Sequence, residues 1–172
     1  MTDVECSNYL VTMKNQTISL NYTIYDSADE LTDDLRKLLT EAKLALSKAY
    51  APYSGFQVGA AAQLVNGAIV SGANCENASY PLCICAEPAT LAAAASAHPG
   101  VAVKTLAITV QNLTRPVADP APPCGACRQM LVEHEDRFQQ PIQLVLQGQS
   151  DQVYVFERIS DLLPLHFSGT FL

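Results

Sequence analysis

Three cysteines and one glutamate, set in two short motifs, constrain this chain more than any other feature. Cys85 and Glu87 are separated by one residue, and Cys124 and Cys127 by two. Three thiolates can hold Zn²⁺ and leave its fourth tetrahedral position to a water, whose pKa then falls to roughly 7. A carboxylate two residues from a ligand can move the proton of that water. The fold must therefore bring the motifs together, and residues 88–123 are long enough for a helix, a return loop and a strand.

A closed structural zinc site is the alternative interpretation of these cysteines. Cys83 or Cys75 would be the fourth ligand, and the chain would be an interaction module rather than an enzyme. Closed sites usually pair one Cys-x₂₋₄-Cys motif with another, and Cys83 lies too close to Cys85 to match. The open site is therefore favoured. Cys6, Cys75 and Cys83 are expected to be small buried hydrophobic residues or idle thiols.

Three further segments accompany the two cysteine motifs in a fixed order: residues 50–60, 72–80 and 162–167. Together the motifs resemble the cytidine deaminase family, in its compact homotetrameric form with three cysteine ligands. The resemblance extends from about Leu38 to Phe167. It implies zinc-dependent hydrolytic deamination of cytidine and deoxycytidine to uridine and deoxyuridine, with release of ammonia, in pyrimidine salvage.

The resemblance also implies a role for each residue of the site. The metal ligands of a single Zn²⁺ per chain are Cys85, Cys124 and Cys127. Glu87 takes a proton from the zinc-bound water, delivers it to N3 of the pyrimidine and returns a proton to the departing ammonia. Phe56 lines the base pocket, while Asn74 and Glu76 hold the ribose 3′ hydroxyl. A neighbouring subunit of the homotetramer closes each site. The residues assigned to that closure are Ala78, Tyr80 and Phe167.

Pro88 departs from the family pattern, which usually has Arg directly after the catalytic Glu. Proline fits a first helical turn, where its missing N–H and fixed φ are tolerated. Without the cation, however, the negative charge of three thiolates on Zn²⁺ is less well compensated, unless Arg128 or the helix starts make up the difference. We therefore expect Pro88 to shift the pH-rate profile or slow turnover. Identical profiles for the native chain and Pro88→Arg would contradict this hypothesis.

Two other functions stay open. Pro88 favours, as a second interpretation, a deaminase of a modified nucleoside or a nucleoside antibiotic, although Asn74 and Glu76 argue for an ordinary ribose or deoxyribose. The third interpretation is a noncatalytic zinc-containing protein that binds nucleosides or partners, and Glu87 argues against it. His98, His134 and His166 have no motif support as metal ligands, so a surface or helix-end role is expected for each.

Charge and hydropathy limit the kinds of ligand and partner that the chain can bind. The chain has 10 basic and 17 acidic residues, a net charge of -7 and no cluster of Lys or Arg. The excess of acidic residues opposes binding of a nucleic acid polymer, whose phosphates require basic side chains. It is compatible with an uncharged nucleoside, which needs no basic pocket. The longest low-polarity stretch, residues 91–97, is far shorter than the ~20 residues of a membrane span. Residues 1–20 show no secretion signal, so a cytoplasmic protein is expected.

Alternating helical and strand periodicities predict an α/β fold: a three-layer α/β/α sandwich with a mixed, roughly five-stranded central sheet, as in cytidine deaminases. The expected helical segments are residues 29–49, a helix from 85 or 88 to 97, residues 124–134 and a last helical turn at 160–163. The expected strands are residues 57–65, 68–73, 105–110, 142–146 and 153–156. Residues 31–172 are expected to form one catalytic domain. Residues 1–30 are expected to form an arm outside the family core, in which apolar side chains alternate from Ile18 to Ile24. Packing of this arm on a neighbouring subunit is one interpretation of the alternation.

Overall fold

The centre of the molecule is a mixed sheet of six strands, seen in a computed structural model that describes residues 14–172. The strands are β1 (Thr23–Tyr25), β2 (Phe56–Leu64), β3 (Ile69–Ala73), β4 (Val103–Asn112), β5 (Gln143–Gln147) and β6 (Val153–Phe156). Their order is β1-β6-β5-β4-β2-β3, and β4 and β5 form the parallel pair. The predicted mixed α/β sheet is confirmed. It has one strand more than expected, because β1 comes from the segment that was expected to form an arm.

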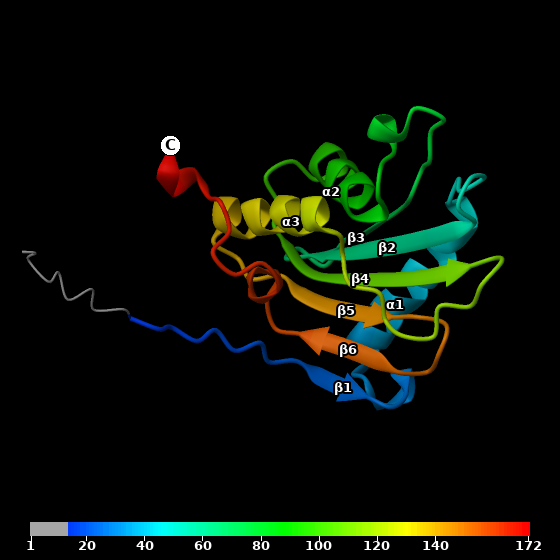
Figure 1. The fold of residues 1–172 in the computed structure, drawn as a ribbon, viewed down its shortest axis with the longest axis horizontal. Coiled ribbons are helices and arrows are strands. Elements are labelled where there is room, and N and C mark those ends of the chain that lie inside the picture. Colours follow the sequence, from blue (N-terminus) through cyan, green and yellow to red (C-terminus); the bar gives the residue numbers. More distant parts are fainter. Residues whose placement is uncertain (1–13) are drawn as a thin grey trace, which may run out of the picture.

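Helices cover both faces of the sheet, which gives the predicted three layers (Figure 1). The α-helices are α1 (Asp33–Ala45), α2 (Ala86–Ala97) and α3 (Gly125–Phe138). Short 3₁₀ turns lie at Ala28–Glu30, Leu46–Lys48, Tyr80–Leu82, Ile159–Leu162 and Gly169–Phe171. In Figure 1, α2 and α3 lie above the sheet and α1 lies behind it. The expected long helix over residues 29–49 is therefore a shorter α1 with a 3₁₀ turn before and after it.

Two apolar clusters join these layers, and strand alternation decides which residues enter each. Successive side chains of a strand point to opposite faces. On the α2 and α3 face the buried strand residues include Ala60, Leu106 and Leu144. On the α1 face they include their immediate neighbours Ala61, Ala107 and Val145. The central strands are therefore apolar on both sides, as expected of a covered sheet.

Two glycines let the helices approach the sheet closely. A Cβ atom on Gly59 of β2 would lie 2.2 Å from the carbonyl oxygen of Ala42 in α1. A Cβ atom on Gly72 of β3 would lie 2.7 Å from Oγ1 of Thr90 in α2. At Gly59 and Gly72 the strands present no side chain, so α1 and α2 pack directly on the strand backbone. The contact at Gly72 sets the distance between α2 and the end of β3.

The segment before α1 packs on the chain's own sheet. β1 pairs with β6 in antiparallel register, with Thr23 opposite Val155, and the ring of Tyr22 stacks on Phe156 at 5.0 Å. The apolar residues of the predicted alternation, Ile18 to Ile24, remain exposed, and β1 covers only its end, Thr23–Tyr25. The expected arm over residues 1–30 lies partly outside the described residues, and its contact with a neighbouring subunit stays a prediction. None of the helices in residues 14–172 has the length and apolarity needed to cross a membrane.

Candidate metal centre and adjoining cavity

The Sγ atoms of Cys85, Cys124 and Cys127 form one cluster. All three lie within 4.8 Å of one another, and those of Cys124 and Cys127 are 3.4 Å apart. Tetrahedral Zn²⁺ with bonds of about 2.3 Å to sulfur would place its thiolates roughly 3.8 Å apart, so this donor set fits one zinc ion. Within residues 14–172, no other group of this kind is found, and neither Cys75 nor Cys83 belongs to it. The observed cluster matches an open three-ligand site.

Two helix starts converge on the cluster. Cys85 is the N-cap residue of α2, and Cys124 is the N-cap residue of α3. Cys127 follows in the first turn of α3 and is buried. Unpaired N–H groups and the positive end of the helix dipole favour thiolate over thiol at such positions. The predicted placement of both motifs at helix starts is therefore confirmed.

The cysteine thiols shift one another's pKa. A hydrogen bond with Cys127 lowers the pKa of Cys85 to about 7, with burial and the charge of Glu87 acting in the opposite direction. The same hydrogen bond, helped by burial, raises the pKa of Cys127 above its ordinary value. All three thiols would have to lose their protons to bind a metal, so metal binding here should depend on pH.

Glu87 lies in the first turn of α2 and is 4% exposed. Burial raises the pKa of this carboxyl, and a hydrogen bond with the Cys127 thiol acts in the opposite direction. Pro88 occupies the next position of the same turn, where its missing N–H costs no helical hydrogen bond. Arg128, which could offset the charge of the sulfurs, donates to the carbonyl oxygens of Pro123 at 2.8 Å and Leu162 at 2.9 Å. None of its hydrogen bonds within the described chain goes to a cysteine.

A cavity of about 280 Å³ opens beside this cluster. Its lining residues come from β2, the end of β3, the start of α2, β4 and the loop before α3. Those predicted from the sequence are Phe56, Asn74, Glu76, Cys85, Glu87 and Cys124. The charged side chains among all lining residues are the two carboxylates, Glu76 and Glu87. The cavity therefore places apolar walls, two acidic groups and the metal ligands around one space.

Asn74 and Glu76 reach this cavity while bonded to β2 and to the turn before it. Asn74 Oδ1 accepts a hydrogen bond from Val58 N at 2.8 Å, and its Nδ2 donates to Phe56 O at 2.9 Å. The Glu76 carboxylate accepts bonds from Tyr53 N at 2.9 Å and Ser54 N at 3.2 Å, and from the Ser54 hydroxyl. The Ser54 hydroxyl and then the Tyr53 N–H lower the pKa of Glu76.

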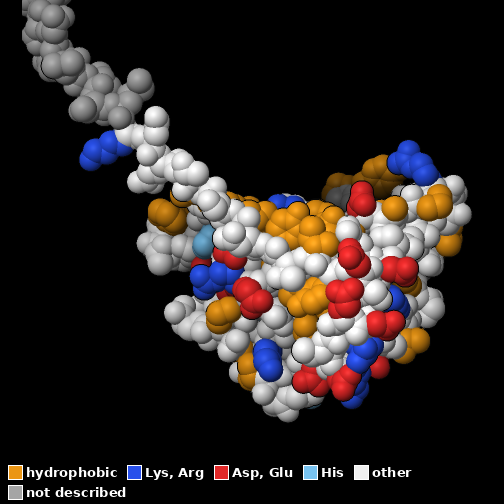
Figure 2. All heavy atoms as spheres, turned by 90° about the horizontal axis from the view of Figure 1, so that it is seen from below, with side chains coloured by type: hydrophobic (Ala, Val, Ile, Leu, Met, Phe, Trp, Pro, Cys, Tyr) orange, Lys and Arg blue, Asp and Glu red, His pale blue; other side chains and the backbone are white. Residues whose placement is uncertain are grey.

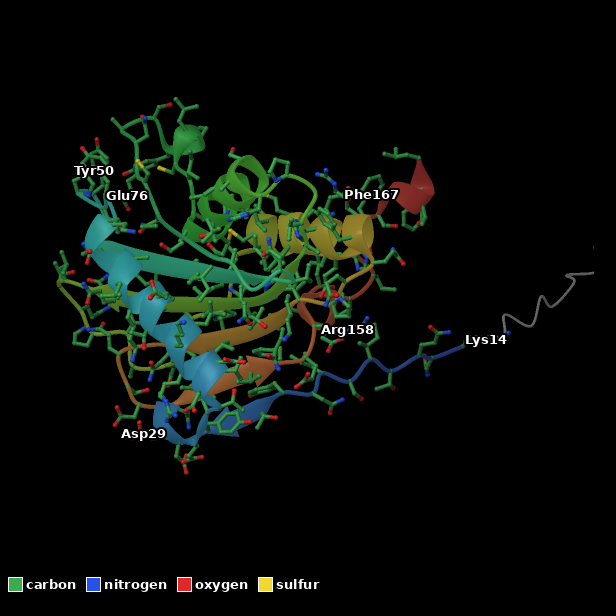
Figure 3. All side chains as sticks on the ribbon, turned by 180° about the vertical axis from the view of Figure 1, so that it is seen from behind. Lys14, Asp29, Tyr50, Glu76, Arg158 and Phe167 are labelled. Carbon is green, nitrogen blue, oxygen red and sulfur yellow. The ribbon has the colours of Figure 1, made fainter. Side chains whose placement is uncertain are left out.

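Three predicted residues do not reach the cavity of their own chain. Ala78, Tyr80 and Phe167 are all exposed and do not line it. Figure 3 shows Phe167 at the opposite end of the molecule from Glu76. The role assigned to these three residues in a neighbouring subunit's site stays a prediction.

Sequence reasoning missed several residues of the cavity wall. Cys75 and Cys83 line it and are exposed free thiols, so of the two expected alternatives, buried residues or idle thiols, burial is wrong for both. Ser54 was also missed, although it lies in the motif of residues 50–60 and precedes Gly55, whose φ of 65° marks a turn. Such a Ser-Gly pair was the available signal for a turn that contacts the site.

Comparisons with known proteins agree with this geometry. The family model described as "Cytidine and deoxycytidylate deaminase zinc-binding region" matches residues 32–138. The cytidine deaminase of Halalkalibacterium halodurans is 40% identical over 138 residues, which cover 79% of this chain and 96% of that protein. The cytidine deaminase of Mycobacterium tuberculosis strain H37Rv is 43% identical over 101 residues, which cover 59% of this chain and 71% of that protein.

Solved structures are similar as well. The crystal structure of cytidine deaminase from Burkholderia pseudomallei is 39% identical, with a TM-score of 0.68, and the match covers 80% of this chain and 100% of that one. The cytidine deaminase from Mycobacterium tuberculosis gives a TM-score of 0.60 at 35% identity, covering 79% of this chain and 98% of the other. The matched family model, the curated relatives and the cysteine cluster lead to the same result: this chain belongs to the cytidine and deoxycytidylate deaminase family, and its three cysteines are the zinc-binding group of that family.

Proposed function

We propose that this protein catalyses the zinc-dependent hydrolytic deamination of cytidine and deoxycytidine to uridine and deoxyuridine, releasing ammonia. One observation carries the proposal: Glu87 and the metal ligands open onto the same cavity as Phe56, Asn74 and Glu76. The cavity therefore combines a carboxyl group that can carry a proton, the metal ligands, and side chains suited to bind a nucleobase and its sugar. The relatives named cytidine deaminases support the same reaction.

The charges around the cavity favour a nucleoside over a nucleotide. The family description covers both cytidine and deoxycytidylate deaminases. The residues that line this cavity include no Lys or Arg, and their two carboxylates would repel a phosphate. On the face drawn in Figure 2, basic side chains are few and lie among acidic ones, which gives no surface for a polynucleotide.

Each residue of the site then has a defined task. Zinc, when bound to the three cysteines, supplies an activated water at neutral pH. Glu87, whose carboxyl pKa is raised by burial, would carry protons to N3 of the base and to the leaving ammonia. Phe56 packs on the base, and Asn74 and Glu76 bind the 3′ hydroxyl of the sugar. The apolar walls exclude bulk water from the reacting atoms.

The direct test is ultraviolet absorbance of cytidine, deoxycytidine and cytidine 5′-monophosphate incubated with the zinc-loaded protein. Both nucleosides should be converted and the nucleotide should not. Glu87→Gln should lower kcat by roughly 10² to 10⁴, because the proton carrier is lost while the shape of the side chain is kept.

Glu133→Gln is the matched control, since Glu133 is an exposed glutamate on α3 and should keep full activity. Zinc content and folding are measured for every variant. A folded native protein with bound zinc that converts neither nucleoside would refute the proposal and favour a modified nucleoside or a noncatalytic role.

We further propose that the active protein is a homotetramer in the cytoplasm. In it, Ala78, Tyr80 and Phe167 of one subunit would complete the site of a neighbour. Their exposure in the single chain supports this assignment, because the rings of Tyr80 and Phe167 remain largely exposed although each contacts one aromatic ring of its own chain.

A further inference from the structure

We propose that Ser54 is a positioning residue for nucleoside binding: its hydroxyl holds Glu76 in place and ties the sugar end of the cavity to the base end. The inference rests on the proposed function, because it assigns Glu76 to the sugar hydroxyl. It adds a residue that touches no substrate itself and acts through Glu76.

Glu76 is held in a cradle of donors from one turn. Tyr53 N and Ser54 N both donate to Oε2, at 2.9 Å and 3.2 Å, and the Ser54 hydroxyl donates to Oε1. Backbone bonds fix the same two segments to each other: Tyr50 N donates to Asn74 O at 2.9 Å, and Glu76 N donates to Tyr50 O at 2.8 Å. Figure 3 shows Tyr50 and Glu76 side by side at one end of the sheet. The carboxylate is therefore oriented before any ligand binds.

The Ser54 hydroxyl also reaches the base end of the cavity. Its oxygen accepts a hydrogen bond from Phe56 N at 3.0 Å while its proton goes to Glu76. Asn74 supports the same strand start, since its side chain bonds Phe56 O and Val58 N. One hydroxyl thus connects the residue assigned to the sugar with the backbone of the residue assigned to the base. Ser54, Phe56, Asn74 and Glu76 all line the one cavity.

This arrangement selects what Glu76 can bind. An ionised carboxylate only accepts hydrogen bonds, so the group that meets it must be a donor such as a sugar hydroxyl. The Ser54 hydroxyl and two N–H groups use part of its acceptor capacity and orient what remains. Removing the hydroxyl leaves the carboxylate held only through Oε2, by the N–H groups of Tyr53 and Ser54, so Oε1 loses its fixed orientation. Ordering the carboxylate again then costs affinity for the sugar hydroxyl. The chemistry at the base, at the other end of the cavity, should change little.

Steady-state kinetics with Ser54→Ala test the proposal. We expect KM for cytidine to rise about tenfold, the size of one charge-assisted hydrogen bond, with kcat within about twofold of the native value. Ser54→Thr keeps the hydroxyl and should restore KM. With 2′,3′-dideoxycytidine, which lacks the hydroxyl that Glu76 binds, native protein and Ser54→Ala should have the same KM. Ser47→Ala is the control, because Ser47 is exposed and its hydroxyl donates to Leu44 O.

Binding of uridine and 2′,3′-dideoxyuridine, measured by calorimetry on the zinc-loaded protein, separates this inference from the proposed reaction. Ser54→Ala should weaken uridine binding about tenfold and leave dideoxyuridine binding unchanged, even if the native protein proved to deaminate no nucleoside. An equal effect on both ligands, an effect on kcat alone, or no rescue by Ser54→Thr would overturn the role given to Ser54. A native protein that binds neither ligand would overturn both proposals.

Discussion

At the scale of single residues, His134 joins α3 to the sheet. Its Nε2 accepts a hydrogen bond from Val103 N at 3.1 Å, and its ring lies 4.6 Å from that of Phe138. Only a neutral imidazole can accept such a bond. Burial lowers the pKa of His134 from its ordinary value, and the charge of Arg137 adds to the effect. We expected only a surface or helix-end role for His134. The structure instead gives its neutral ring a hydrogen bond that holds α3 on the sheet.

We predict that this histidine makes the fold acid-sensitive. With its pKa lowered in the folded state, the unfolded chain binds more protons below the ordinary value of 6.5, so the free energy of unfolding falls as pH drops below that value. Denaturant unfolding from pH 7.5 to 5.5 should show this loss in the native protein. His134→Asn should be less stable at pH 7.5 but show a shallower pH dependence. His98→Asn should keep the native slope, and a native slope in His134→Asn would disprove the assignment.

Residue-level prediction succeeded where the signal was local. Cys124 and Cys127 are one helical turn apart, and Cys85 and Glu87 are nearly adjacent, so the spacing of the motifs predicted the observed cluster of three cysteines. The bond between Ser54 and Glu76 joins residues 22 positions apart in a turn and a strand end. No periodicity encodes such a contact, because it exists only after β2 and β3 have paired.

At the scale of elements, Gly59 sets the distance between α1 and β2. We predict that Gly59→Ala lowers the free energy of unfolding by about 2 to 3 kcal/mol, since the new methyl group would meet the backbone of Ala42 and push the helix off the sheet. Chemical denaturation measures the change. Gly169→Ala, where an added Cβ meets nothing within 4 Å, should change stability by less than about 0.5 kcal/mol. Equal stability of the two variants would contradict the close approach.

The sequence predicted the type of most elements, helix or strand, better than it predicted their first and last residues. The expected strand over residues 105–110 is β4, Val103–Asn112, because pairing with β2 runs from Leu64 opposite Val103 to Phe56 opposite Asn112. Pairing partners, not the strand's own composition, set its ends. For the same reason the alternation from Ile18 to Ile24 becomes a strand only at Thr23–Tyr25, where β6 offers a partner.

At the scale of the whole molecule, exposed aromatic residues argue for assembly. Tyr80 is 71% exposed and Phe167 is 58% exposed, and neither lines the cavity of its own chain. Analytical ultracentrifugation should give the mass of a tetramer, and activity should fall on dilution as the assembly dissociates.

Phe167→Ala should raise KM for cytidine at least severalfold or weaken the assembly, because the ring would be missing from a neighbour's site. Leu172→Ala, which removes a fully exposed side chain at the end of the same segment, should do neither. A fully active monomer would contradict both predictions and would leave the sites complete within one chain.

The pairing of β1 with β6 also has a consequence for how the chain is made. Residues 23–25 are synthesised on the order of ten seconds before Val153–Phe156, the strand with which they pair. Throughout that interval the nascent sheet lacks the edge on which Tyr22 stacks. Chains released before β6 is complete would expose both an unpaired strand and this aromatic ring, which are the features that chaperones and proteases recognise in unfinished proteins.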